Sequence, residues 1–455
     1  MSGPAPTSGP TPTSGPAPTS GSPEERIAPP SARLGQPANE PAPQRGVRVV
    51  LDARLLQEGE RAPTSAAYLG ELLAAFARRP IPGESFALLL RSDLDDPSEA
   101  ILGLDVVGRR LLPPTRVLRA GALTLDPFLL SGASVGAAWR AERSGAAGAV
   151  FHAVGAATPL FAQIPVVVTL LDLAPWELTA VFQRGAAARL GQRLRARFLR
   201  EAAAVIVGSD AVAAQAHRLL HVRRERLRVV RLAPRPAFRV SAAARKAATG
   251  RGAGDDAHRL GLPARYLVYP GRFDARQDLA TLLGALGELA RAGRPDALPA
   301  DEPWPPRVLL VGASPDDRAA IARAAMRHGV GDALAYTPAL DAGRLAGLIR
   351  GARAVVLPVL SEGAGLTAIE SLAAGVPVVG SAVGALPEII GPAGLLVEPR
   401  DVDRLAVALS TVMTNDALHA QIAAEAAEHA AADIRTWDDV ADETRAVYAE
   451  VGARA

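Results

Sequence analysis

The sequence has no cysteine, few aromatic residues and no long hydrophobic run. Without cysteine, disulfide frameworks, thiolate metal sites and cysteine nucleophiles are excluded. Aromatic residues make up only 4% of the 455 residues, whereas hydrophobic residues make up 49%. Alanine, valine and leucine must therefore form the core, which suits buried parallel strands covered by helices better than an all-β sandwich.

Membrane-spanning segments and nucleic-acid binding are not indicated either. The longest apolar runs, such as residues 166–171 and 308–311, are far shorter than the ~20 residues that a membrane-crossing helix needs. The first residues lack the charged and apolar regions of a signal peptide, so we expect a cytoplasmic location. The formal net charge is +3, and no basic stripe with interleaved aromatics indicates nucleic-acid binding.

The chain opens on a six-residue repeat, SGPAPT, which recurs nearly unchanged from Ser8 and Ser14. Proline fixes φ and has no backbone N–H, so this tract cannot form a regular helix or a strand ladder. We therefore expect residues 1–45 to be a disordered tail rich in Pro, Ser and Thr.

Beyond the tail, short strands rich in valine and leucine alternate with helical segments. This alternation predicts an α/β protein with two doubly wound, Rossmann-like parallel sheets. We expect one such domain over 46–238 and a second over 263–430. Residues 239–262 lack periodicity and are predicted to be a linker, and a C-terminal helix over 431–455 could pack back on the first domain.

The segment LPVLSEGAGLTAIE, residues 357–370, gives the clearest indication of a functional site. A buried strand is predicted to end near Pro358, followed by a loop with Gly363 and Gly365 and a helix from about Leu366. Such a turn aims backbone N–H groups and the positive end of the helix dipole at one point, which suits a phosphate. The glycines let the backbone approach an anion closely.

This segment has two other interpretations. Residues 363–368 match the dinucleotide fingerprint G-x-G-x-x-A, but they come late in their domain, and Gly380 and Ser381 stand where an acidic residue is needed. Glu362 and Glu370 could instead be the carboxyl pair of a glycoside hydrolase, in which the two groups flank one bond about 5–9.5 Å apart. A loop and a helix carboxylate beside a phosphate site fit sugar and ribose hydroxyls better.

Residues 361–379, SEGAGLTAIESLAAGVPVV, resemble the signature E-G-F-G-L-x-x-x-E-A-x-A-x-G-x-P-V of the family-four, or group 1, GT-B glycosyltransferases. Pro387–Glu388 and residues 394–399 are similar to the segment that follows it. Residues 150–152, 165–173, 203–209 and 226–230 fall in the family's order and are most similar to bacterial mannosyltransferase-like members. The resemblance implies the GT-B fold, two Rossmann-like domains that face each other across a cleft.

The resemblance also implies roles for the motif residues. Glu362 would contact the transferred sugar, and Glu370 would bind the nucleotide ribose. The backbone at Gly363, Ala364, Gly365 and Leu366 would lie near the sugar and the diphosphate.

The diphosphate site only partly follows the family. Family members place an arginine and a lysine, five residues apart, on the leaving diphosphate. This chain has Arg272 but carries Gln277 in place of the lysine. A neutral amide cannot replace a charge, and Arg276 could substitute.

The first domain departs further from the family. Leu171 stands before Asp172, where members have a His-Asp pair whose histidine contacts the sugar. The family's glycine-rich loop is replaced by Arg61–Tyr68, which has no glycine. His152 matches a cleft histidine of the subgroup, although a lone histidine is more often a core or surface residue.

Taken with the resemblance, the sequence predicts a retaining glycosyltransferase of polysaccharide biosynthesis that takes a mannose- or glucose-type hexose from a nucleotide-diphosphate sugar. The acceptor would be a glycan or a lipid-linked molecule, and no cofactor or metal is implied. The alternative is a catalytically impaired homologue that binds the donor or a partner protein. A helix with Arg184, Arg189, Arg193, Arg195, Arg197 and Arg200 could also contact a membrane peripherally, or be an ordinary solvated face.

Overall fold

The computed structural model describes residues 46–59, 61–114, 129–132, 148–155, 157–239, 253–271, 273–432 and 435–452. The predicted tail over residues 1–45 lies outside this part of the chain. Two parallel sheets, one of seven and one of six strands, organise the described residues. The predicted α/β fold with two doubly wound sheets is confirmed.

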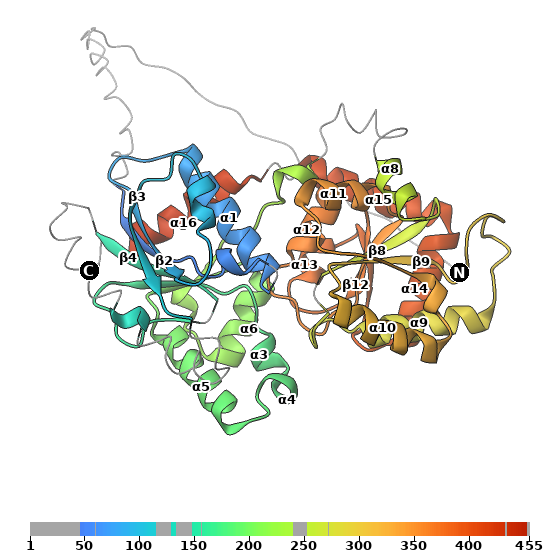
Figure 1. Cartoon of the computed structure of the whole chain (residues 1–455), viewed down its shortest axis with the longest axis horizontal. Coiled ribbons are helices and arrows are strands. Elements are labelled where there is room, and N and C mark those ends of the chain that lie inside the picture. Colours follow the sequence, from blue (N-terminus) through green and yellow to red (C-terminus); the bar gives the residue numbers. More distant parts are fainter. Residues whose placement is uncertain are drawn as a thin grey trace, which may run out of the picture. The chain divides into compact units, whose positions relative to one another are not determined.

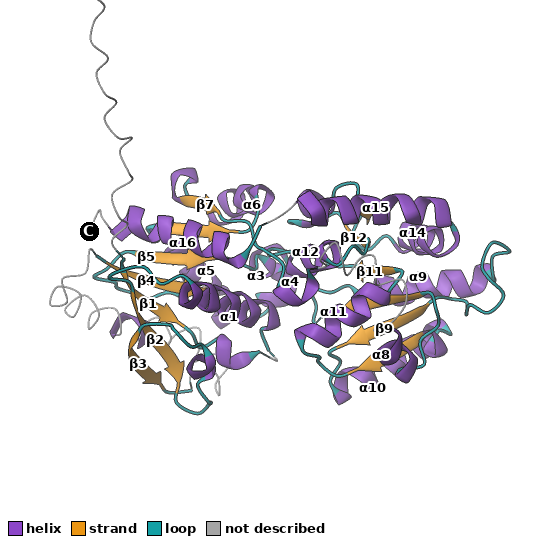
Figure 2. Cartoon of the chain, turned by 90° about the horizontal axis from the view of Figure 1, so that it is seen from above, coloured by secondary structure: helices purple, strands orange, loops and turns teal. Residues whose placement is uncertain are grey.

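The first lobe is built on the seven-stranded sheet, in the order β3-β2-β1-β4-β5-β6-β7. Figure 2 shows β1 to β5 side by side. Its strands are β1 (Arg48–Asp52), β2 (Ser85–Arg91), β3 (Val106–Leu112), β4 (Ala149–Val154), β5 (Val166–Thr169), β6 (Ala204–Val207) and β7 (Leu227–Val229). Its helices are α1 (Pro63–Arg78), α3 (Ala174–Glu177), α4 (Thr179–Phe182), α5 (Ala186–Glu201) and α6 (Asp210–Leu220).

The second lobe is built on the six-stranded sheet, in the order β10-β9-β8-β11-β12-β13. Its strands are β8 (Tyr266–Pro270), β9 (Arg307–Val311), β10 (Leu334–Thr337), β11 (Ala354–Leu357), β12 (Val378–Ser381) and β13 (Gly394–Val397). Its helices are α8 (Ala253–Arg259), α9 (Leu279–Ala292), α10 (Pro315–His328), α11 (Ala342–Gly351), α12 (Leu366–Ala373), α13 (Leu386–Ile390), α14 (Val402–Thr414) and α15 (Asp416–Ala432).

Helices cover both faces of each sheet, so central strands such as β4, β6, β8 and β11 are buried on both sides. In the first lobe α1 packs on one face, and α5 and α6 pack on the other. In the second lobe α9, α10 and α14 cover one face, and α8, α11, α12 and α15 cover the other (Figure 1). This two-sided burial explains why the strands are continuous runs of Val, Leu and Ile rather than alternating patterns.

The order of the strands reverses beside β1 in the first sheet and beside β8 in the second. In open parallel sheets, ligands bind outside the carboxyl ends of the strands at such switch points. The loops that leave β1 and β4 in the first sheet and β8 and β11 in the second therefore lie where a ligand site is expected.

The predicted linker over 239–262 is wrong for its described C-terminal part. Residues 253–259 form α8, and Ala257, Leu260 and Leu262 pack into the core of the second lobe. The three apolar residues are too few to give a clear helical period among the surrounding glycine and charged residues. Residues 240–252 of the predicted linker lie outside the described part.

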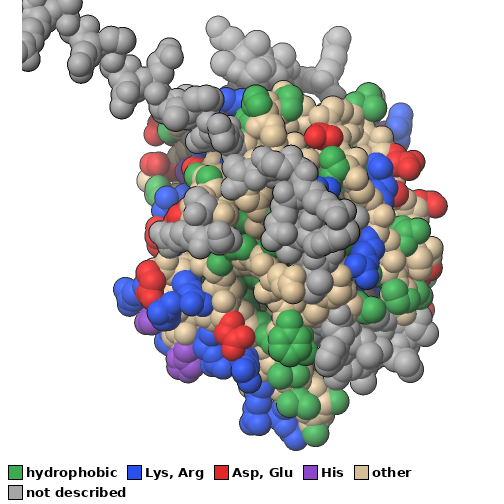
Figure 3. Space-filling view, turned by 90° about the vertical axis from the view of Figure 1, so that its left-hand side faces the viewer, with side chains coloured by type: hydrophobic (Ala, Val, Ile, Leu, Met, Phe, Trp, Pro, Cys, Tyr) green, Lys and Arg blue, Asp and Glu red, His purple; other side chains and the backbone are tan. Residues whose placement is uncertain are grey.

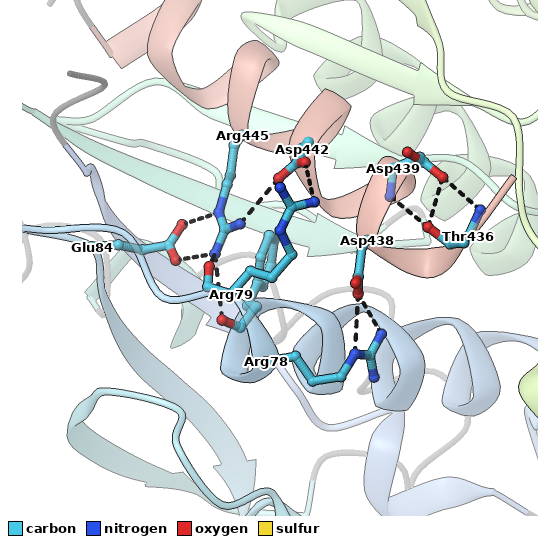
Figure 4. A network of polar contacts seen from close by, with 9 residues as sticks. Arg78, Arg79, Glu84, Thr436, Asp438, Asp439, Asp442 and Arg445 are labelled. Carbon is cyan, nitrogen blue, oxygen red and sulfur yellow. Dashed lines mark hydrogen bonds and ion pairs between the residues drawn. The ribbon is translucent and has the colours of Figure 1, made fainter.

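The last helix, α16 (Trp437–Gly452), returns to the first lobe and packs against α1 and β4. Arg445 is the buried link: its guanidinium donates to both carboxylate oxygens of Glu84, at 2.9 and 2.7 Å (Figure 4). The two side chains are only 4% and 5% exposed. The guanidinium also lies 4.9 Å from the centre of the Phe76 ring.

Replacing Arg445 by methionine should strongly destabilise the fold. The change leaves Glu84 as a buried, unpaired carboxylate, and breaking a buried pair in this way costs about 3–5 kcal/mol. The matched control is Arg78→Met on α1, because the Arg78–Asp438 pair also joins α1 to α16 but is 48% and 29% exposed. An exposed pair contributes less than about 1 kcal/mol. Urea unfolding followed by tryptophan fluorescence compares the two variants, and equal shifts would contradict this account.

Candidate functional site

The motif segment folds into a strand, a tight loop and a helix. The buried strand β11 ends at Leu357, and α12 begins at Leu366. Gly365 caps α12 with a φ of +64°, a left-handed conformation that glycine adopts without strain. A Cβ atom at Gly365 would lie 2.1 Å from Cδ1 of Ile389. The backbone conformation therefore favours glycine at this position, and any other residue would also require the end of the Ile389 side chain to move.

The loop after β11 is tied to the loop after β8. Asp278 donates its amide to the carbonyl of Pro358 at 2.7 Å, and Leu360 donates its amide to the carbonyl of Arg276 at 2.6 Å. These hydrogen bonds flank a short antiparallel bridge between Gln277 and Val359. Arg276 is thereby held beside the motif.

Glu362 folds back onto the start of α12. Its carboxylate accepts the amide of Gly365 at 2.9 Å, so that backbone donor, predicted to be free for a phosphate, is occupied in this structure. Burial raises the pKa of Glu362, and the nearby Asp172 raises it further. The helix amides and Arg276 oppose this increase.

Glu370 lies on α12 and is only 3% exposed. Arg235 binds it with two hydrogen bonds, from Nε to Oε1 at 2.5 Å and from Nη2 to Oε2 at 3.0 Å. Burial raises the pKa of Glu370, and Arg235 is the main group that lowers it. The ion pair therefore favours the carboxylate form of Glu370.

Arg276 links the two lobes. Its Nη1 donates to Oδ2 of Asp172 at 2.6 Å, and its Nη2 donates to Oδ2 of Asp274 at 2.7 Å. Burial works against the charge of Arg276, but Asp274 and Asp172 outweigh it and raise its pKa. The predicted partner cation, Arg272, lies outside the described residues. The single lysine of the sequence, Lys246, lies outside them too.

The backbones of the two lobes come close together at Gly363. A Cβ atom there would lie 2.5 Å from the carbonyl oxygen of Leu171 and 3.2 Å from Cα of Asp172. Ala364 and Leu366 of the second lobe pack into the apolar core of the first. On the same border, the Ser361 hydroxyl donates to the carboxylate of Glu177.

A cleft of about 360 Å³ lies between these groups. From the predicted site, Asp172, Arg276, Glu362, Gly363, Leu366 and Glu370 line it. Ala364 and Gly365 are not among the lining residues. The segment without glycine, Arg61–Tyr68, forms the first turns of α1 from Pro63. Its residues Pro63, Thr64, Ser65 and Ala67 line the cleft from the first lobe.

His152 does not lie in the cleft, contrary to its predicted substrate contact. It is fully buried, and its ring nitrogens are engaged by Thr169 at 2.8 Å and by Tyr448 of α16 at 2.6 Å. Burial lowers the pKa of His152 to about 3, although Asp52 acts in the opposite direction. The ring is a neutral core group because the last helix covers it.

Arg235 is the cleft residue that the sequence did not reveal. It belongs to the segment that passes from β7 to the second lobe, and it lines the cleft beside Glu370 and Thr367. No motif marks it, since its partner Glu370 is 135 residues away. Asp93 and Asp95 have the D-x-D spacing of some metal sites, but Asp93 lies in a turn and binds Arg91 at 2.5 Å. The described residues contain no group of three or more His, Cys, Asp or Glu that could hold a metal ion.

Comparison with known proteins identifies the second lobe. Residues 264–415 match the sequence model of the family described as glycosyl transferases group 1. We call these residues the group 1 domain after this match. The predicted resemblance is thus confirmed, and the domain contains both motif glutamates and Arg276.

Curated relatives of the group 1 domain are similar over part of their length. The MMP α-(1→4)-mannosyltransferase of Mycolicibacterium hassiacum is 35% identical over 129 residues, 28% of this chain and 31% of that protein. The D-inositol 3-phosphate glycosyltransferase of Stackebrandtia nassauensis is 32% identical over 200 residues, 42% of this chain and 43% of that protein. The chain therefore spans less than half the length of either relative.

Solved structures share the fold over nearly the whole chain. Sucrose-phosphate synthase from Thermosynechococcus elongatus has a TM-score of 0.68 at 21% identity, covering 90% of this chain and all of that one. Anabaena HepE, solved in complex with UDP and glucose, has a TM-score of 0.63 at 16% identity, covering 89% of this chain and 100% of that one. The two lobes, the second of which contains the group 1 domain, therefore have the GT-B fold.

Replacing Asp172 by asparagine should tighten the binding of an anion in the cleft. Asp172 now occupies Nη1 of Arg276, so an incoming phosphate must compete with it. The pair is partly exposed, at 40% for Asp172 and 24% for Arg276. Removing a competitor worth about 1 kcal/mol should tighten binding about fivefold. Calorimetric titration with inorganic pyrophosphate measures the change.

The control for this variant is Glu388→Gln. Glu388 also joins the lobes, through Arg231 at 3.1 Å, but it does not line the cleft. Its variant should bind pyrophosphate with unchanged affinity. If Asp172→Asn binds pyrophosphate more weakly than the wild-type protein does, Asp172 and the phosphate do not compete for Arg276.

Proposed function

We propose that the protein is a retaining glycosyltransferase that moves a hexose from a nucleotide-diphosphate sugar to a glycan or lipid-linked acceptor. The observation that carries this proposal is the placement of Glu362, Glu370 and Arg276 around one cleft between two GT-B lobes. The name of one relative, a mannosyltransferase, supports a mannose-type sugar. Transfer of a hexose to such an acceptor corresponds to a role in polysaccharide biosynthesis.

The donor would lie along the second lobe. Glu370 accepts hydrogen bonds from the ribose hydroxyls, and Glu362 accepts them from the transferred sugar. Arg276 neutralises the diphosphate, with Arg272 as its predicted partner. The backbone at Gly363 lets the donor approach the motif closely, and Leu366 begins the helix whose positive end faces the phosphates. No cofactor or metal takes part in this proposal.

Transfer occurs on the face of the sugar that Asp172 and the start of α1 border. The bond between the anomeric carbon and the diphosphate oxygen breaks, and the acceptor hydroxyl oxygen bonds to that carbon from the same face. The acceptor proton passes to the departing diphosphate. Two carboxylates, Asp172 and Glu362, stabilise the positive charge that develops on the sugar ring.

Replacing Glu362 by glutamine should slow donor hydrolysis and transfer. A hydrogen bond from the sugar to a charged acceptor is worth about 1.5–3 kcal/mol, so the rate should fall about 10- to 100-fold. Release of nucleoside diphosphate from UDP- and GDP-linked glucose and mannose measures the rate. The control is Glu398→Gln, which changes a carboxylate after β13 that does not line the cleft. An unchanged rate in Glu362→Gln would contradict its role.

A second candidate function is a donor-binding homologue with reduced or lost activity. The observation that favours it is Leu171, an apolar residue packed against Gly363 where a histidine would donate a hydrogen bond. Gln277, which stands in place of the family's lysine, also favours this candidate. Its Oε1 is buried without a hydrogen-bond partner among the described residues. Binding of a nucleotide sugar without turnover would favour this second candidate. Absence of any binding at millimolar donor would exclude both.

The acceptor side of the proposal includes a peripheral membrane contact through α5, on the cytoplasmic face. Arg189, Arg193, Arg197 and Arg200 of α5 are exposed, as is Arg184 just before it, and Leu190 on the same helix is 55% exposed. Basic side chains gather at the lower end of the face in Figure 3, next to apolar ones. No helix among the described residues is long and apolar enough to cross a bilayer.

The double variant Arg193→Gln, Arg197→Gln should bind anionic vesicles about 30-fold more weakly, because each of the two arginines near an anionic surface contributes about 1 kcal/mol. The control is Arg323→Gln, Arg327→Gln, an exposed pair with the same spacing on α10. Sedimentation with phosphatidylglycerol vesicles measures binding. Equal binding by both variants would contradict a contact through α5.

A further inference from the structure

Arg235 lies at the point where the chain passes from the first lobe to the second. Three residues later, Phe238 is fully buried in the core of the second lobe. The guanidinium carbon of Arg235 lies 5.0 Å from the centre of the Phe238 ring, and the side chain is 22% exposed. Its backbone is thus fixed by the second lobe, and its guanidinium is stacked on a ring. The hydrogen bonds to Glu370 are therefore made by a preorganised side chain.

The charges around Glu370 make Arg235 necessary. The charged groups that act on the Glu370 pKa are Arg235 and Glu71 of α1. Glu71 itself is acted on by Arg235 and by Arg78, which is paired with Asp438. Without Arg235, two carboxylates would lie near each other with little compensation, and a buried carboxylate in that position takes up a proton.

The geometry leaves Glu370 able to bind a ligand. A carboxylate offers about four acceptor positions, two on each oxygen. The guanidinium of Arg235 uses one position on each oxygen, since Nε binds Oε1 and Nη2 binds Oε2. The backbone amide of Arg235 also acts on this carboxylate, and both Glu370 and Thr367 line the cleft. The two oxygens of this fixed carboxylate match the two neighbouring hydroxyls of a ribose.

We propose that Arg235 is a positioning residue that fixes Glu370 to accept both hydroxyls of a ribose, and so makes the site selective for ribonucleotides over 2′-deoxyribonucleotides. This inference rests on the proposed function of the cleft. It assigns the selectivity to the plane of one carboxylate, which two parallel hydrogen bonds from a guanidinium define. A carboxylate that rotates freely or takes up a proton would bind a 2′-deoxyribonucleotide, which offers one hydroxyl, as well as a ribonucleotide, which offers two.

The test is a double-mutant cycle between Arg235→Met and Glu370→Gln. Methionine keeps the length and the contact with Phe238, while glutamine keeps the shape without the charge. Calorimetry with UDP, GDP and ADP first finds which nucleotide binds wild-type protein, and its 2′-deoxy form is then compared. Arg235→Met should weaken binding of the ribonucleotide about tenfold and bring the ratio of ribo to deoxy affinities close to one.

The cycle separates positioning from an independent role. If Arg235 acts through Glu370, the double variant binds the ribonucleotide no more weakly than Glu370→Gln alone, because no carboxylate remains to be fixed. Arg235→Lys keeps one hydrogen bond and the charge, so it should recover part of the affinity. Arg231→Met is the control: Arg231 is four residues earlier and also joins the lobes, but it does not line the cleft. It should leave the ratio unchanged.

The pH profile gives a further readout. In Arg235→Met the pKa of Glu370 rises further above its usual value, so the carboxylate form is lost at a higher pH as the pH falls. The ratio of wild-type to variant affinity should therefore be larger at pH 6 than at pH 8, and the titration of the ligand cancels in that ratio. A ratio independent of pH would contradict the inference.

The outcomes distinguish this inference from the function on which it rests. If wild-type protein binds none of the three nucleotides at millimolar concentration, the proposed function and the inference are both wrong. If wild-type protein binds one and Arg235→Met keeps the full preference for ribose, only the inference is wrong. Additive effects of Arg235→Met and Glu370→Gln would also overturn it, with circular dichroism confirming that each variant is folded.

Discussion

The contact between the backbone of Gly363 and that of Leu171 and Asp172 is the constraint on which the site depends. No side chain fits between them, since a Cβ atom at residue 363 would lie 2.5 Å from the carbonyl oxygen of Leu171. Around this point, Ala364 and Leu366 enter the apolar core of the first lobe. The motif of the second lobe is therefore also the surface on which the first lobe rests, and a ligand beside Gly363 must act on both.

The charges in the cleft follow from this arrangement. Each functional group has a partner in the structure: Glu370 has Arg235, Arg276 has Asp172 and Asp274, and Glu362 has the amide of Gly365. Buried charges require such partners, and a ligand with hydroxyls and phosphates offers replacements for them. A nucleotide-diphosphate sugar carries both kinds of group, and the cleft holds both kinds of partner. The ligand-free pairs thus correspond to the contacts proposed for the donor.

The local parts of this site were predictable from the sequence, and the long-range parts were not. The strand, loop and helix over 357–370 follow from a short apolar run, two glycines and an apolar helix, all within one segment. Arg235 escaped prediction because its partner is 135 residues away and no motif joins them. His152 was placed in the cleft on family order, whereas Tyr448, 296 residues later, encloses it in the core. The apolar residues in 253–262 are too few to give a clear helical period, so α8 could not be predicted without the core surface against which it packs.

The central claim is that the cleft around Glu362, Glu370 and Arg276 binds a nucleotide-diphosphate sugar. A crystal structure of the protein grown with UDP-glucose or GDP-mannose tests it most directly. The account predicts ribose hydroxyls within hydrogen-bond distance of the Glu370 carboxylate, phosphate oxygens on Arg276 in place of Asp172, and the hexose beside Glu362. A nucleotide bound outside this cleft, or bound in it with the ribose away from Glu370, would contradict the account.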